Sequence, residues 1–154
     1  EALNMIGDKT DIKLLLAGGV SKESQDVLQK IIDANLADRV IVAGFLTDEE
    51  LAWCYENAEM LLFCSIYEGF GLPPLEAMRH NLPVIASNVT SIPEVVGDAA
   101  LMINPYSVDE IADGIMELLT NQDKRTDLIK KGQERIKLFS WKKTAEETLK
   151  ILKN

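Results

Sequence analysis

A short loop between a predicted strand and a predicted helix constrains the fold of this chain more than any other segment. The strand is the apolar run 60–64, and the helix begins near Leu75. The nonapeptide Glu68-Gly-Phe-Gly-Leu-Pro-Pro-Leu-Glu76 follows the strand and runs into the start of the helix. A loop that leaves the carboxyl end of a parallel strand and enters a helix is where open α/β sheets bind ligands. We therefore expect an α/β fold with a ligand site at this loop.

The rest of the chain repeats this alternation of strand and helix. Apolar runs predict strands at 12–17, 39–42, 60–64, 83–86 and 101–103. Capping residues and apolar spacing predict helices at 21–35, 47–58, from 74, from 107, at 123–137 and at 141–152. The alternation favours a Rossmann-like, doubly wound parallel sheet with helices on both faces. Because 154 residues suit one domain, we assign residues 1–154 to a single domain.

Two of the helix starts carry a specific signature. Thr47 followed by Glu50 predicts a capping box, in which the side chain of each residue bonds the backbone of the other. Ser91 followed by Glu94 predicts a capped single turn. We therefore interpret Glu94 as part of a cap and not as a site residue.

The backbone of the nonapeptide suits an anion. Gly69 and Gly71 lack a Cβ, so a ligand can approach the main chain closely. Pro73 and Pro74 suit the first turn of a helix and have no N–H group. The free amides are therefore concentrated at 69–72, in front of the positive end of a helix dipole. Such a position favours a phosphate.

Two carboxylates flank these amides. Glu76 falls in the predicted first helical turn, where it can accept hydrogen bonds from two neighbouring hydroxyls, as on a ribose. Glu68, at the strand end, can do the same for a sugar. The alternatives are that Glu76 only partners the helix dipole and that Glu68 is a solvated loop residue. A phosphate cradle between two hydroxyl acceptors favours a sugar nucleotide as the ligand.

Longer segments resemble a known family. They are Glu68-Gly-Phe-Gly-Leu-Pro-Pro-Leu-Glu76-Ala-Met, Leu82-Pro-Val-Ile-Ala-Ser-Asn88 and Ser91-Ile-Pro-Glu94-Val-Val-Gly-Asp98-Ala-Ala-Leu. Together they resemble the C-terminal, donor-binding domain of a family 4 glycosyltransferase, a retaining enzyme of the two-domain GT-B type. The resemblance extends from about Ile12 to the C-terminus and includes Ala43-Gly44-Phe45-Leu46.

The resemblance implies a role for each matching residue. Glu68 would contact the transferred sugar, and it is our candidate catalytic residue. Glu76 would bind the ribose, and Phe45 and Leu46 would lie near the base. Sugar hydroxyls and the diphosphate would be held by the loop residues Gly69, Phe70, Gly71 and Leu72. No metal or other cofactor is expected, since the chain has no Asp-x-Asp motif and His80 is its only histidine.

The chain departs from the family pattern in two places. Family members begin this domain with a strand that carries Gly-Arg and, a few residues later, a Lys, and both basic groups face the diphosphate. Glu1-Ala2-Leu3 resembles the end of the helix after that strand, so we expect the strand, its basic groups and the acceptor-binding N-terminal domain to be missing. The remaining basic candidates are Lys22 and Arg79. The second departure is Arg79-His80-Asn81, where the family usually has small residues and a glycine.

A missing strand and the composition of the chain bear on its partners. The missing strand would leave a sheet edge open to self-association. A net charge of −9 and a pI near 4.6 argue against nucleic acid and anionic membranes. Cys54 and Cys64 lack the spacing of a zinc or disulfide motif, which favours a cytoplasmic protein.

The resemblance therefore predicts a hexosyltransferase of polysaccharide biosynthesis. It would move a hexose from a UDP-, GDP- or ADP-sugar to a glycan or lipid-linked acceptor with retention. Because the acceptor domain and the basic groups would be missing, we expect the isolated chain to be inactive. The alternatives are a non-catalytic module that binds nucleotide sugars or other proteins, and a GT-B epimerase or phosphorylase. An epimerase would need acid–base residues that this chain does not show.

Overall fold

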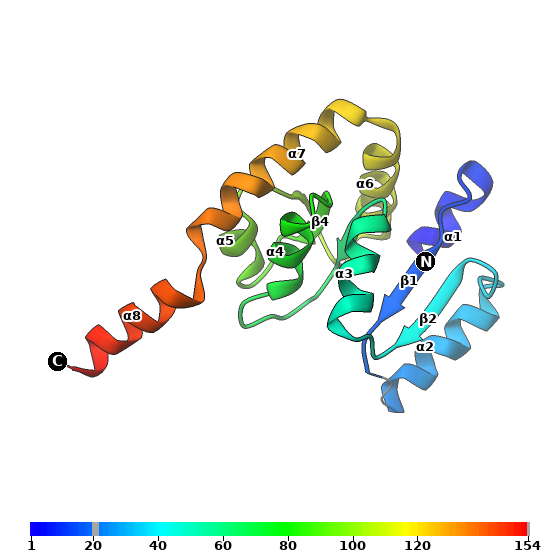
Figure 1. Cartoon of the computed structure of the whole chain (residues 1–154). Helices are drawn as coiled ribbons and strands as arrows, with labels where there is room; N and C mark the ends of the chain where they lie inside the picture. The colour runs from blue at the N-terminus through cyan, green and yellow to red at the C-terminus, as the bar shows by residue number, and fades with distance from the viewer. Residues whose placement is uncertain (20–21, 154) are drawn as a thin grey trace.

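The computed structural model describes the backbone of residues 1–19 and 22–153, and their side chains apart from Asp8 and Lys22 to Gln25. Helices and strands alternate along most of this length (Figure 1). The strands are β1 (Leu14–Ala17), β2 (Val40–Gly44), β3 (Leu61–Phe63), β4 (Val84–Ser87) and β5 (Leu101–Ile103). The helices are α1 (Ala2–Ile6), η1 (Gly7–Lys9), α2 (Lys22–Asp33), α3 (Asp48–Asn57), α4 (Leu72–Arg79), α5 (Ile92–Val96), α6 (Val108–Thr120), α7 (Gln122–Arg135), η2 (Ile136–Leu138) and α8 (Trp141–Leu152).

All the strand pairs are parallel, which confirms the Rossmann-like α/β class. The strands form two sheets, β1–β2 and β3–β4–β5. In the larger sheet Leu61 lies opposite Val84, and Ile85 lies opposite Leu101. In the part of the chain that the structure describes, β1 pairs only with β2, and β3 only with β4. Each of β1 and β3 therefore has one unpaired edge among the described residues.

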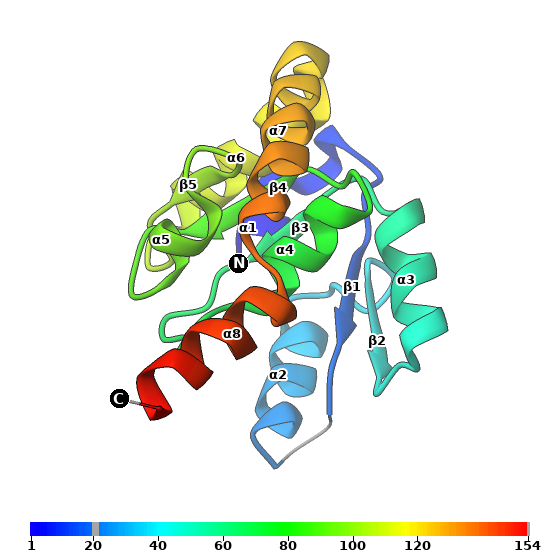
Figure 2. The same ribbon diagram turned by 60° about the vertical axis from the view of Figure 1, so that its left-hand side comes forward.

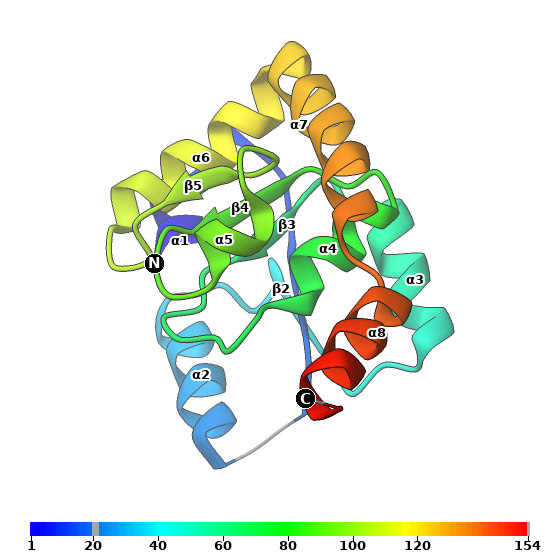
Figure 3. The ribbon, with the colours of Figure 1, turned by 90° about the vertical axis from the view of Figure 1, so that its left-hand side faces the viewer.

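The main core is built around β4, which has a strand on each side and helices on both faces. Figure 3 shows α4 and α5 on the side of the sheet toward the viewer, with α6 beyond it. Val84 and Ala86 pack among the buried residues of α4 and α5. Ile85 points the other way and packs with α6 and Ile6 of α1. The period-2 alternation of a strand thus divides β4 between two apolar clusters.

The ends of several helices agree with their sequence signatures. The Thr47 side chain accepts from the Glu50 amide, and the Glu50 carboxylate accepts from the Thr47 amide, so the predicted capping box at α3 is present. The Ser107 side chain accepts from the Glu110 amide at the start of α6. The predicted cap at Ser21 lies outside the described residues. Asn81, after α4, has the left-handed φ of 59° that its residue type tolerates.

The last helix, α8, extends away from the body of the molecule (Figure 1). Its apolar residues Trp141, Leu149, Ile151 and Leu152 are exposed. An amphipathic helix normally buries such a stripe against another element. In the described structure this stripe faces solvent.

Candidate functional site

The predicted ligand loop lies between the end of β3 and the start of α4. Gly71 caps α4 with a left-handed φ of 96°. A Cβ at this position would lie 2.4 Å from Cδ1 of Ile92. Glycine is therefore required here for two reasons, its backbone conformation and the close approach of α5. The two prolines follow in the first turn of α4 and have no N–H group of their own to be left unpaired.

A second loop holds the ligand loop in place through side-chain hydroxyls. Ser91 Oγ donates to the carbonyl oxygens of Glu68 and Phe70 at 3.0 and 3.1 Å. The Glu68 amide donates to Thr90 Oγ1 at 3.3 Å. The prediction that Ser91 caps α5 was therefore wrong, since α5 has no side-chain cap and the Ser91 hydroxyl is used between the loops.

The amides of the loop are unpaired among the described residues, although Gly69 and Phe70 are exposed whereas Gly71 is buried. Those of Gly69, Phe70 and Gly71 donate to no acceptor among the described residues. The carbonyls, and not the amides, bind Ser91, which leaves three N–H groups next to the N-terminus of α4. Unpaired amides next to a helix N-terminus are suited to an anion, and the binding of a phosphate here stays a prediction.

Glu76 occupies a different place in its helix from the predicted one. Because α4 begins at Leu72, Glu76 lies in the second turn and not in the first. The alternative of a simple dipole partner loses its basis, since that effect is confined to the first turn. Instead the Oε2 atom of Glu76 accepts a hydrogen bond from the Tyr55 hydroxyl at 3.0 Å. Glu68, at the other end of the loop, is half-buried.

A pocket of about 280 Å³ lies beside the ligand loop. Its lining includes Gly69, Phe70, Arg135 and Phe139. The Phe70 and Phe139 rings meet edge to face at 5.8 Å, and the Arg135 guanidinium lies 5.3 Å from the centre of the Phe139 ring. The loop therefore packs against the segment that follows α7.

Arg135 is the basic residue that the structure brings to this pocket, and the sequence did not point to it. Its guanidinium donates to the carbonyl of Val95 at 2.9 Å and also to that of Glu94. It therefore supplies hydrogen bonds to the last turn of α5. Arg79, one of the predicted basic candidates, is exposed on α4, and the side chain of Lys22 is not described. Only tertiary packing joins Arg135 to the loop, so no local signal could have found it.

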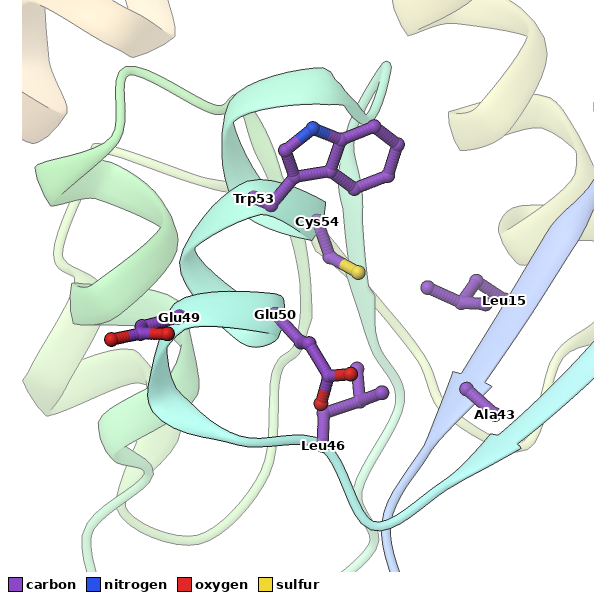
Figure 4. Close-up of a pocket in the computed structure, with 7 residues that line it drawn as sticks. All are labelled: Leu15, Ala43, Leu46, Glu49, Glu50, Trp53 and Cys54. Atoms are coloured by element: carbon purple, nitrogen blue, oxygen red, sulfur yellow. The ribbon is translucent and has the colours of Figure 1, made fainter.

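A second pocket, of about 440 Å³, lies between α3 and the β1–β2 sheet (Figure 4). Its lining residues are Leu15, Ala43, Leu46, Glu49, Glu50, Trp53 and Cys54. Of the two residues predicted near the base, Leu46 lines this pocket, whereas Phe45 is 84% exposed and does not. This larger pocket is mostly apolar and contains no part of the ligand loop. We place the candidate site at the loop because the unpaired amides are there.

The Cys64 thiol directly follows β3 and is half-buried. Burial raises the pKa of the Cys64 thiol to about 11, so the thiol is protonated and unreactive near neutral pH. Within the described residues, no group of three or more His, Cys, Asp or Glu side chains is placed to hold a metal ion. No helix formed by these residues has the length and apolar character needed to cross a membrane.

Comparisons with known proteins agree with the resemblance at the loop. Residues 1–135 match the family described as Glycosyl transferases group 1. The O-antigen chain mannosyltransferase B of Escherichia coli is 38% identical over 90% of this chain, which spans 37% of that protein. The solved structure of sucrose-phosphate synthase from Thermosynechococcus elongatus is 29% identical, with a TM-score of 0.84. The match covers 99% of this chain and 41% of the synthase chain.

A further solved structure shares the fold at lower identity. It is Anabaena HepE in complex with UDP and glucose, which is 22% identical with a TM-score of 0.86 over 99% of this chain and 42% of its own. The chain thus spans less than half the length of each of these three proteins. The solved structures are of the GT-B type, as the sequence predicted. The described fold and the match over residues 1–135 show that this chain belongs to the group 1 glycosyl transferases.

Proposed function

We propose that residues 1–154 form the donor-binding domain of a retaining hexosyltransferase that uses a nucleoside-diphosphate sugar. The unpaired amides of Gly69, Phe70 and Gly71 carry this proposal, because they immediately precede α4 and have no acceptor among the described residues. They and the amide of Leu72 would bind the diphosphate. Glu68 would bind hydroxyls of the transferred hexose, Glu76 the ribose, and Phe45 and Leu46 would lie near the base.

In this reaction the bond between the anomeric carbon and the diphosphate oxygen breaks, and a bond to the acceptor oxygen forms on the same face of the sugar. The proton of the acceptor hydroxyl passes to the departing diphosphate. Negative charge grows on the leaving diphosphate and positive charge on the anomeric carbon. Preorganised amides aimed at the diphosphate stabilise the first of these charges. Glu68 orients the hexose through its hydroxyls and is not the general base.

The hexose and the acceptor are narrower proposals. The mannosyltransferase relative of Escherichia coli favours mannose, activated as a UDP-, GDP- or ADP-sugar, and a growing surface polysaccharide or lipid-linked glycan as the acceptor. We assign acceptor binding to a separate N-terminal domain, so the 154-residue chain is expected to bind the donor without turning it over. The two free thiols, Cys54 and Cys64, favour the cytoplasm, where nucleoside-diphosphate sugars are made.

Donor binding can be tested directly by calorimetric titration of the purified chain with UDP-, GDP- and ADP-hexoses. We expect one of the three to bind, and Glu68→Gln and Glu76→Gln each to weaken it about tenfold, the value of one charged hydrogen bond. Glu117→Gln is the matched control, since Glu117 is exposed on α6 and away from the loop. Affinity that is unchanged by EDTA would agree with the absence of a metal from the site.

The competing non-catalytic module makes a different prediction. If no member of the panel produces heat with the wild-type chain, the donor-binding function is wrong. If the donor binds and both glutamine variants bind as tightly as the wild type, the ligand lies elsewhere and the loop is not the site.

A further inference from the structure

Tyr55 and Glu76 form a contact that joins two helices beside the candidate site. Tyr55 lies near the end of α3 with 9% of its surface exposed, and its hydroxyl donates to Oε2 of Glu76 at 3.0 Å. The two residues lie on different helices, since Glu76 belongs to α4. A buried ring on one helix therefore holds an exposed carboxylate on another.

The Tyr55 ring is itself fixed on its other side. It stacks on the His80 ring with 5.7 Å between the ring centres and 27° between the planes. Nδ1 of His80 lies 3.3 Å from a carboxylate oxygen of Glu56, which is also on α3. The phenol therefore has little freedom to rotate away from Glu76.

The protonation of Tyr55 is set by its surroundings. Burial raises the pKa of Tyr55 far above its usual value, and the negative charge of Glu76 raises it further. The phenol consequently stays protonated and acts as the donor, while the carboxylate acts as the acceptor. A carboxylate has two oxygens, and Oε1 of Glu76 has no hydrogen-bond partner among the described residues.

We propose that Tyr55 is a positioning residue for nucleotide recognition, which orients the Glu76 carboxylate so that Oε1 is presented to the ribose hydroxyls. A free glutamate side chain loses rotamer entropy when it is ordered. Because Tyr55 orders it before the ligand arrives, less of this cost falls on binding. The inference rests on the proposed function, since it requires a nucleoside diphosphate at the loop.

The test is the variant Tyr55→Phe, which keeps the buried ring and removes only the hydroxyl. The purified chain is titrated calorimetrically with GDP, UDP and ADP, and with the 2′,3′-dideoxy form of whichever binds. We expect Tyr55→Phe to weaken the ribonucleotide about fivefold and the dideoxynucleotide less than twofold. The double variant Tyr55→Phe/Glu76→Gln should bind no more weakly than Glu76→Gln, because the two residues act as one unit.

Tyr106→Phe is the matched control, since Tyr106 is exposed and lies outside the loop. It should bind both nucleotides as the wild type does, and thermal unfolding checks that each variant is folded. If Tyr55→Phe weakens both nucleotides equally, or neither, the positioning role is wrong even though donor binding stands. If no nucleotide binds at all, the proposed function fails and this inference fails with it.

Discussion

The two sheets have similarly apolar strands, but only one of them is buried. Ile85 in β4 is 0% exposed, whereas Ile41 in β2 is 49% exposed and Leu15 in β1 is 40% exposed. Figure 2 shows β1 and β2 with α2 and α3, set beside the larger sheet and its helices. The apolar residues Val27, Leu28 and Ile32 of α2 are also exposed.

The difference teaches that an apolar strand is buried only when neighbouring strands and helices cover it. β4 pairs with strands on both sides and has helices on both faces. β1 pairs on one side only, and beneath α3 a pocket of about 440 Å³ separates it from the helix. The ligand loop belongs to the well-packed half, while Phe45 and Leu46 belong to the loosely packed half. We therefore expect mutations to affect the two halves very differently.

The largest contrast should come from matched isoleucine truncations. Ile85→Ala is expected to lower the free energy of unfolding by about 4 kcal/mol, because it leaves a cavity between two packed layers. Ile41→Ala should cost no more than about 1 kcal/mol, since its side chain is already half in water. Urea unfolding measures both. Equal losses would mean that the two sheets are packed equally well.

Two glycines with positive φ, one in each half, test the same difference in packing. Gly71→Ala should cost about 3 kcal/mol, because its new Cβ would collide with Ile92 and its backbone would be strained. Gly44 at the end of β2 has a φ of 70° but no atom within 4 Å of an added Cβ. Gly44→Ala should therefore cost only about 1 kcal/mol, from the backbone alone. The same unfolding experiment compares them, and a larger loss at Gly44 would contradict the packing argument.

We propose that the open edge of β1 makes the chain self-associate at high concentration, a smaller effect than either truncation. Leu14 and Gly18 donate to the β2 side, so by alternation the amides of Leu15 and Ala17 face the other edge. Sedimentation should show a mass that rises with concentration, and Leu15→Lys should suppress the rise. Val27→Lys on α2, which adds the same charge in the same half, is the control. A wild-type chain that stays monomeric would rule the edge out.

The smallest effect should be a pH dependence at the start of α3, which borders both halves. The backbone and side-chain hydrogen bonds of Thr47 lower the pKa of Glu50 from its usual 4.5. The capping box therefore stabilises α3 fully above pH 4.5, and this contribution is lost as the pH falls through the lowered pKa. Nuclear magnetic resonance of the Thr47 amide would follow it. Glu50→Gln should abolish the pH dependence, and a transition that persists in this variant would point to another group.

Much of the fold followed from local patterns. The alternation of strands and helices, the capping box at Thr47 and the glycine at 71 each act within a few residues, so they could be predicted. The start of α4 could not be placed as well. The two prolines suggested a start near residue 74, but the helix begins at Leu72, which moved Glu76 into its second turn.

Contacts between distant segments explain the remaining differences. Serine is a common helix-capping residue, yet the Ser91 hydroxyl donates to the carbonyls of Glu68 and Phe70. Local pattern predicts which groups need a partner, but not which partner tertiary packing brings close. The same holds for Arg135 at the loop and for Tyr55 beside Glu76. Their roles depend on residues that lie far away along the chain.

The amino-acid sequence determines the class of the fold and the chemistry of the loop, because residue periodicity, missing Cβ atoms and missing N–H groups are local properties. Tertiary structure decides which amides stay free, which carboxylate is held by a phenol, and which apolar strands are buried. These outcomes depend on the layers that cover each element. An apolar side chain in β1 and one in β4 differ in burial only because different neighbours surround them.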